Sequence, residues 1–290
     1  MSKTISTFPA YAGWLREYCA AHAHPFIRDS SKMIDYCFEV DRNLPDNYHW
    51  RFSSEESLKI QVKGVSSSMD LNRIYWTDQA RNIEAYSMTT FWRGVELLKP
   101  AIRGLNIREI TGPAVLARSL LEIGCTFIMH ANNLEKTLSE LSFPANTVVA
   151  SHEFEEMVVK MIWGTRYGDP EPHLKQTNVL SCIQKVAKNP NATDVLSTYE
   201  YLCDIAHPSF IGNTRFWSHV EELLADSSER RVISRYASGD TSMEILDKIL
   251  WSLGWSAAVL RNGFEITRSG LEKLLDKINR ANQGIQPTAE

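Results

Sequence analysis

Two stretches of the sequence place ionisable side chains where a helical core is expected to be apolar. Residues 199–209 carry Tyr199 and His207 just before a proline. Residues 113–129 form an apolar run that carries Arg118 and Glu122. Because burying such groups is costly unless partners satisfy them, these four side chains are the candidates for a catalytic or binding site.

Arg118 and Glu122 lie four residues apart, so a helix brings them onto one face. Two interpretations follow. The two side chains form an internal ion pair that orients the helix against its neighbours, or the arginine holds an anion or a carboxylate-activated group inside the bundle. If the pair is buried, removal of one partner is expected to destabilise the fold strongly.

His207 stands at the expected end of a helix, immediately before Pro208. The carbonyl end of a helix dipole favours protonated histidine. His207 is therefore either a cap for free carbonyls or a general acid or base, with Asp204 three residues earlier as an orienting group. We expect the imidazole to be partly exposed and to share one cleft with the Arg118 guanidinium.

Known metal and cofactor motifs do not fit. The stretch that begins at His152 resembles the start of a zincin helix, but Glu156 occupies the place of the second histidine. Phosphate-binding glycine loops and the G-x-S-x-G elbow are missing from the sequence. We therefore expect no metal and no cofactor.

Charge, cysteine content and hydropathy indicate the kind of environment in which the protein is expected to work. A net charge of −4 and a pI near 6.1 argue against bulk electrostatic capture of nucleic acid, although a local basic patch remains open. Five scattered cysteines without a C-x-x-C motif are typical of reduced thiols in a cytoplasmic protein. The run at 113–129 is short and interrupted by charge, so no membrane span is expected.

Helical periodicity dominates the chain and predicts an all-α helical bundle. The helix that begins at Thr111 is apolar nearly all round and should lie at the centre. Residues 228–237 allow one short β-hairpin. The other predicted helices span residues 9–21, 30–41, 77–98 (ending before Pro100), 146–163, about 175–188, 194–207, 215–225, 241–262 and 267–281.

The domain prediction has three parts. Residues 1–72 form an N-terminal helical region, residues 73–283 form the main bundle, and residues 284–290 form a frayed tail. The first boundary depends only on mixed composition between residues 42 and 70, because no flexible linker marks it.

Three motifs together resemble a group of uncharacterised bacterial helical proteins. They are Ala117-Arg118-Ser-Leu-Leu-Glu122, Trp163-Gly164-Thr165-Arg166 and Tyr199-x-x-Leu202-Cys203-x-x-Ala206-His207-Pro208-Ser209. The resemblance covers about residues 110–215. That group is similar to the HEPN-type helical fold.

The HEPN resemblance implies a metal-independent ribonuclease of a bacterial stress or phage-defence system. It implies RNA as substrate, His207 as acid or base at the ribose 2′-hydroxyl, and Arg118 at the phosphate, with Glu122 and Tyr199 completing the site. The family motif has four to six residues between its arginine and its histidine. Positions 200–202 hold Glu, Tyr and Leu instead, so Arg118 on the neighbouring helix has to replace it.

Two other functions remain open. The chain is a non-enzymatic module that binds a protein partner or forms a homodimer, with its ion pair serving packing only. Alternatively, the bundle holds a small-ligand pocket around Glu122 and Cys125.

Overall fold

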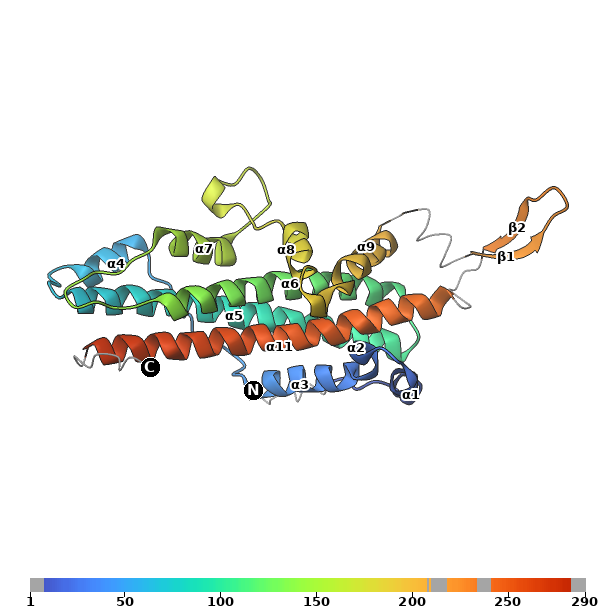
Figure 1. The fold of residues 1–290 in the computed structure, drawn as a ribbon, viewed down its shortest axis with the longest axis horizontal. Helices are drawn as coiled ribbons and strands as arrows, with labels where there is room; N and C mark the ends of the chain where they lie inside the picture. Colours follow the sequence, from blue (N-terminus) through green and yellow to red (C-terminus); the bar gives the residue numbers. More distant parts are fainter. Residues whose placement is uncertain (1–7, 208, 210–217, 234–240, 283–290) are drawn as a thin grey trace. The chain divides into compact units, whose positions relative to one another are not determined.

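The computed structural model describes residues 8–207, 209, 218–233 and 241–282. These residues form α-helices, short 3₁₀ turns and one two-stranded antiparallel sheet, which confirms the predicted all-α fold with a hairpin (Figure 1). Pro208 and the predicted frayed tail at 284–290 lie outside the described residues, as do residues 215–217 of one predicted helix.

The chain forms two compact units, and each draws on separate parts of the sequence. The first unit contains residues 1–44, 92–126 and 182–261, and the second contains residues 45–91, 127–181 and 262–290. Three long helices contribute to both units: α5 (Ser68–Asn106), α6 (Thr111–Glu140) and α11 (Thr241–Asn282). The predicted boundary near residue 72 lies within α5.

The first unit packs short helices against parts of α5, α6 and α11. Its other helical elements are α1 (Gly13–Ala21), α2 (Pro25–Arg28), α3 (Ser30–Asn43), the 3₁₀ turn η2 (Pro190–Ala192) and α9 (Asp194–Ala206). Helix α8 (Val179–Val186) crosses from the second unit into it. Gly254 lets α11 lie directly against α2 and α3, because a β-carbon there would meet the Phe26 carbonyl and Ser30.

The second unit contains α4 (Glu55–Val62), α7 (His152–Trp163) and the 3₁₀ turn η1 (Pro172–Leu174) beside its parts of the long helices. Buried Asn72 fixes the segment before α7: its amide donates to the Thr147 carbonyl at 2.8 Å and accepts from the Val149 amide at 2.7 Å. Its core includes the large side chains Trp76, Phe91, Phe127 and Phe154.

Helix α5 does not end before Pro100, as predicted, but continues through it to Asn106. It also begins at Ser68 rather than near residue 77. A proline inside a helix removes one hydrogen bond, at a cost of about 3 kcal/mol. The turn that follows Pro100 buries Ala101, Ile102 and Leu105 completely, and this apolar burial offsets the cost.

Helix α6 begins at Thr111, as predicted, but it is not buried all round. Ala117, Leu120 and Leu121 are fully buried, whereas Val115 is 37% exposed and Ile123 is half-buried. Among the described helices, α6 alone is long and apolar enough to cross a membrane, and half of that window is buried in the structure. Core helices of soluble proteins meet the same criterion.

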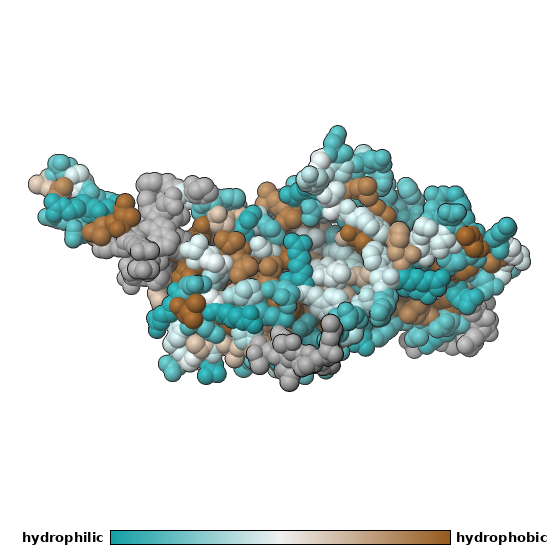
Figure 2. Space-filling model, turned by 180° about the vertical axis from the view of Figure 1, so that it is seen from behind, coloured by the Kyte–Doolittle hydropathy of each residue, from teal (hydrophilic) through white to brown (hydrophobic). Residues whose placement is uncertain are grey.

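The helix predicted at 215–225 is wrong over its described part, which forms strand β1 (Ser218–Leu223). Strand β1 pairs antiparallel with β2 (Glu229–Ile233). The hairpin therefore begins earlier than the predicted range of 228–237, in which only β2 lies. The connecting turn decides this outcome. Asp226 accepts hydrogen bonds from the amide and hydroxyl of Ser228 at 3.0 and 2.6 Å, and Ser227 has a φ of 66°. Figure 2 shows hydrophobic and hydrophilic residues together on this hairpin.

Two further predictions about helix ends need correction. The helices predicted at 241–262 and 267–281 are one helix, because Gly263 stays helical and packs closely on the Phe127 ring. Helix α7 begins after Ser151, whose hydroxyl accepts from the Phe154 amide, and not at Asn146. It ends before Gly164, as predicted, but Gly164 is not left-handed (φ −56°).

Candidate functional site

Three of the four predicted site residues meet in the first unit, between α6 and α9. The Arg118 guanidinium contacts the Glu122 carboxylate at 3.0 Å, so the predicted ion pair is present. The Tyr199 hydroxyl donates to the same carboxylate oxygen at 3.0 Å. Arg118 Nε also donates to the Cys203 sulfur at 3.1 Å. We call Arg118, Glu122, Tyr199 and Cys203 the α6–α9 cluster.

Helical spacing explains how the α6–α9 cluster forms. Arg118 and Glu122 are one turn apart on α6, and Tyr199 and Cys203 are one turn apart on α9. The guanidinium lies 5.6 Å from the centre of the Tyr199 ring, in cation–π geometry. Each cluster member therefore has a partner on the facing helix.

The cluster is electrostatically balanced. Burial alone would lower the pKa of Arg118, but its hydrogen bonds to Cys203 and Tyr199 and the charge of Glu122 together raise it. Burial, opposed by the bond to Arg118, raises the pKa of Tyr199 to about 12. At neutral pH the arginine is therefore charged and the tyrosine is protonated, and the Glu122 carboxylate lies 3.0 Å from the guanidinium.

The ion pair is half-buried rather than fully buried. The side chains of Arg118 and Glu122 are 23% and 28% exposed. The desolvation cost of the two charges is therefore smaller than in a closed core, and water or an anion can reach the guanidinium.

His207 is the fourth predicted site residue, and it lies at the C-cap of α9 with an exposed side chain, as predicted. Its backbone amide bonds the Cys203 carbonyl at 2.9 Å, so it sits one helical turn beyond the cluster. Among the described residues, no side-chain hydrogen bond or ion pair joins its ring to Arg118. Their meeting in one cleft stays a prediction.

The predicted ligand pocket around Glu122 and Cys125 also stays a prediction. Cys125 is fully buried in α6, and burial raises the pKa of its thiol. That thiol therefore belongs to the helix packing.

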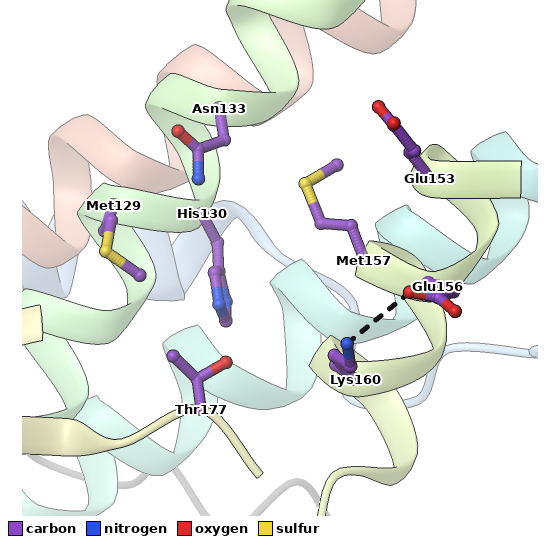
Figure 3. A pocket seen from close by; sticks show the side chains of 8 residues that line it. All are labelled: Met129, His130, Asn133, Glu153, Glu156, Met157, Lys160 and Thr177. Carbon is purple, nitrogen blue, oxygen red and sulfur yellow. Dashed lines mark ion pairs between the residues drawn. The ribbon is translucent and has the colours of Figure 1, made fainter. Parts of the chain in front are cut away.

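A pocket of about 270 Å³ lies in the second unit, between α6 and α7 (Figure 3). Sequence reasoning did not single it out. Charged side chains of α7 line one wall, where Lys160 pairs with Glu156 at 3.6 Å. Its lining residues are Met129, His130, Asn133, Glu153, Glu156, Met157, Lys160 and Thr177.

His130 is the chemically distinctive residue of this pocket. Its ring points from α6 toward the loop that carries Thr177 (Figure 3), and its Nδ1 lies 2.7 Å from the Tyr86 hydroxyl. The side chain is only 6% exposed, and burial lowers the pKa of the imidazole to about 4. Because the ring is buried and hydrogen-bonded to Tyr86, it contributes to the packing of α6 against α5.

The sequence did carry a signal for His130. It lies three residues after Phe127 and four before Leu134, on the inward stripe of α6. Its buried partner Tyr86 lies on α5, 44 residues away, and nothing local points to it.

We also looked for side chains that could bind a metal ion. Within the described ranges, no three histidine, cysteine, aspartate or glutamate side chains are grouped so as to hold a metal ion.

Comparison with known proteins leaves the family open. No protein-family model, no curated protein and no solved structure matches this chain.

Proposed function

We propose that this chain is a HEPN-like, metal-independent ribonuclease, or a degenerate relative of one, acting in the cytoplasm in a bacterial stress or phage-defence system. Its site is the α6–α9 cluster together with His207. The five cysteines are all free thiols, which supports a reducing compartment.

One observation carries the proposal: the register of α6 against α9. Arg118 faces Cys203, and Glu122 faces Tyr199, so the two helices run antiparallel at the cluster. His207 stands about one turn beyond Cys203, about 6 Å farther along α9. That turn lies toward the start of α6, whose free amide groups favour anions. We expect a phosphate bound there to reach both the Arg118 guanidinium and the exposed His207 imidazole.

The roles follow from this arrangement. His207 removes the proton from a ribose 2′-hydroxyl, whose oxygen attacks the adjacent phosphorus. The P–O5′ bond breaks, a 2′,3′-cyclic phosphate forms, and the 5′-oxygen takes up a proton. Arg118 stabilises the negative charge on the phosphate, while Glu122 and Tyr199 hold the guanidinium in place.

The competing function is a non-enzymatic module that binds a protein partner or dimerises. A specific observation favours it: Arg118 already has the Glu122 carboxylate and the Cys203 sulfur as partners. In that case the cluster fastens α6 to α9 and carries out no reaction.

An RNA-cleavage assay separates the two functions. Purified wild-type protein should cleave single-stranded RNA in the presence of EDTA, and His207→Ala should reduce the rate by about 100-fold or more. His152→Ala, which removes another exposed histidine, is the matched control and should cleave as wild type does. Full activity in His207→Ala would remove that residue from the mechanism.

If neither wild type nor the control cleaves RNA, the interaction module is the better function. Light scattering over a range of protein concentrations then tests whether the chain forms a dimer.

A further inference from the structure

Three aromatic side chains form an exposed cluster in the second unit. Trp50, Phe52 and Trp163 contact one another with ring centroids 5.5–6.0 Å apart. Their exposed fractions are 38%, 56% and 37%. Large aromatic rings that stay exposed together usually mark a binding surface. We call these three residues the aromatic cluster.

The aromatic cluster has firm supports. The Trp50 indole donates to the side chain of buried Asn82 on α5 at 3.0 Å. Trp163 is the last residue of α7. Just beyond it, the Thr165 amide donates to the Leu174 carbonyl at 2.9 Å, and the Thr165 carbonyl accepts from the Gln176 amide at 3.1 Å. The rings are therefore held in place before any ligand arrives.

Two arginines accompany the aromatic cluster in the chain. Arg51 lies between Trp50 and Phe52, and Arg166 lies three residues after Trp163. Both are exposed, and neither forms an ion pair with another described residue. Tyr167, beside Arg166, is 93% exposed. Exposed aromatic side chains and exposed arginines are thus close together in the sequence at both segments that form the cluster.

We propose that the aromatic cluster, with Arg51 and Arg166, is a binding site for single-stranded RNA. Unpaired bases stack on exposed aromatic rings, and guanidinium groups pair with the phosphates between them. Bases inside a duplex are already stacked and cannot reach the rings. The choice of RNA rather than DNA rests on the proposed ribonuclease function; the choice of a single strand rests on the cluster alone.

The two exposed arginines favour an anionic ligand such as RNA over an apolar protein partner at this surface. The whole chain has a net charge of −4, so its overall field repels a polyanion. A local site must then supply its own cations, and two exposed arginines lie next to or near the ring-bearing residues in the sequence. A purely apolar protein contact would leave both guanidinium groups without partners.

Fluorescence anisotropy with a labelled single-stranded RNA of about 12 nucleotides tests the site. Phe52→Ala and Trp163→Ala should each weaken binding about ten-fold, the typical loss for one stacked base. Tyr36→Ala removes an aromatic ring of similar exposure from the first unit and should leave affinity unchanged. Circular dichroism checks that each variant is folded.

The two arginines are tested separately, through the dependence of RNA affinity on salt concentration. Arg51→Gln and Arg166→Gln should each lower the slope of log affinity against log salt by about 0.7, the value for one phosphate contact on a single strand. Arg73→Gln, at an exposed arginine paired with Asp70, should not change the slope. These two variants keep the site testable even if Trp163→Ala does not fold.

The proposed RNA-binding site and the proposed ribonuclease activity can be disproved independently of each other. No binding by wild type, equal binding of duplex RNA, or unchanged affinity in Phe52→Ala would overturn the site, whatever the cleavage assay gives. Loss of binding in Phe52→Ala supports the site even if the chain never cleaves RNA. Equal affinity for single-stranded DNA keeps the stacking surface but overturns the choice of RNA.

Discussion

The two halves of α6 each carry a partly or fully buried ionisable side chain, one charged and the other uncharged. In the first unit, Arg118 keeps its charge because Glu122, Tyr199 and Cys203 surround it and about a quarter of its side chain meets solvent. In the second unit, buried His130 has lost its charge and keeps one polar contact, to Tyr86. The same helix therefore meets the cost of a buried ionisable group in two ways: by supplying partners or by neutralising the group.

The difference bears on function. A charged, half-exposed guanidinium can still interact with an incoming anion, whereas a neutral, buried imidazole mainly fills space. We therefore place the proposed chemistry at the α6–α9 cluster. The pocket beside His130 carries no proposed activity.

The largest expected effect on stability is at buried His130. His130→Ala leaves a cavity and removes the hydrogen bond between the imidazole and the Tyr86 hydroxyl, so the free energy of unfolding at about pH 7.5 should fall by about 3 kcal/mol. Urea denaturation measures it. Asn133→Ala, at an exposed neighbour in the same pocket, should change it by less than about 0.5 kcal/mol. A loss below about 1 kcal/mol in His130→Ala would mean that the ring is not packed as described.

The second effect is pH dependence. The folded pKa of His130 is about 4 against an ordinary 6.5, so the unfolded chain binds the proton first as the pH falls. This residue adds no pH dependence above about pH 7. It should cost about 2 kcal/mol of stability by pH 5 and about 3 kcal/mol below pH 4.

Denaturation of wild type and His130→Gln at about pH 7.5 and pH 5 measures this dependence. The glutamine variant should lose about 2 kcal/mol less than wild type between the two values. Parallel losses would show that His130 is protonated in the folded protein and would break the comparison.

The third effect on stability concerns the ion pair between Arg118 and Glu122. Arg118→Met strands Glu122 at a half-buried position, so unfolding should become easier by about 2 kcal/mol, below the 3–5 kcal/mol typical of a fully buried pair. The double change Arg118→Met with Glu122→Leu should cost less than about 1 kcal/mol. Thermal unfolding of both variants tests this, with Arg73→Met as the exposed-pair control. Equal losses in the single and double variants would rule out pairing as the cause.

A fourth, smaller effect concerns the hydroxyl of Tyr199. Tyr199→Phe removes the hydrogen bond to Glu122 and should cost about 1 kcal/mol. The cost should disappear when Glu122 is already leucine, because the two residues then share no interaction. A double-mutant cycle measures this coupling, and additive losses would separate Tyr199 from the cluster.

The smallest effect is at His207. The exposed C-cap side chain has no partner among the described residues, so His207→Ala should change stability by less than about 0.5 kcal/mol. Because this variant should fold as wild type does, it is suitable for the cleavage assay. A loss above about 1 kcal/mol would instead indicate a structural role.

Local information in the sequence was enough for much of the helical framework. Proline and glycine signals predicted the start of α6 at Thr111, the end of α7 at Trp163 and the end of α9 at His207, one residue beyond its observed end. The four-residue spacing of Arg118 and Glu122 predicted their ion pair. These features depend on neighbours within one or two helical turns, so a single stretch of chain contains the necessary information.

Tertiary contacts decided the rest. Helix α5 passes through Pro100 because the next turn is buried, and α11 stays continuous at Gly263 because Phe127 packs there. The pairing of Tyr199 with Glu122 and of His130 with Tyr86 joins residues 77 and 44 positions apart. Helical periodicity indicates that a side chain faces inward, but only the packing of separate helices determines which partner, and hence which charge state, it meets there.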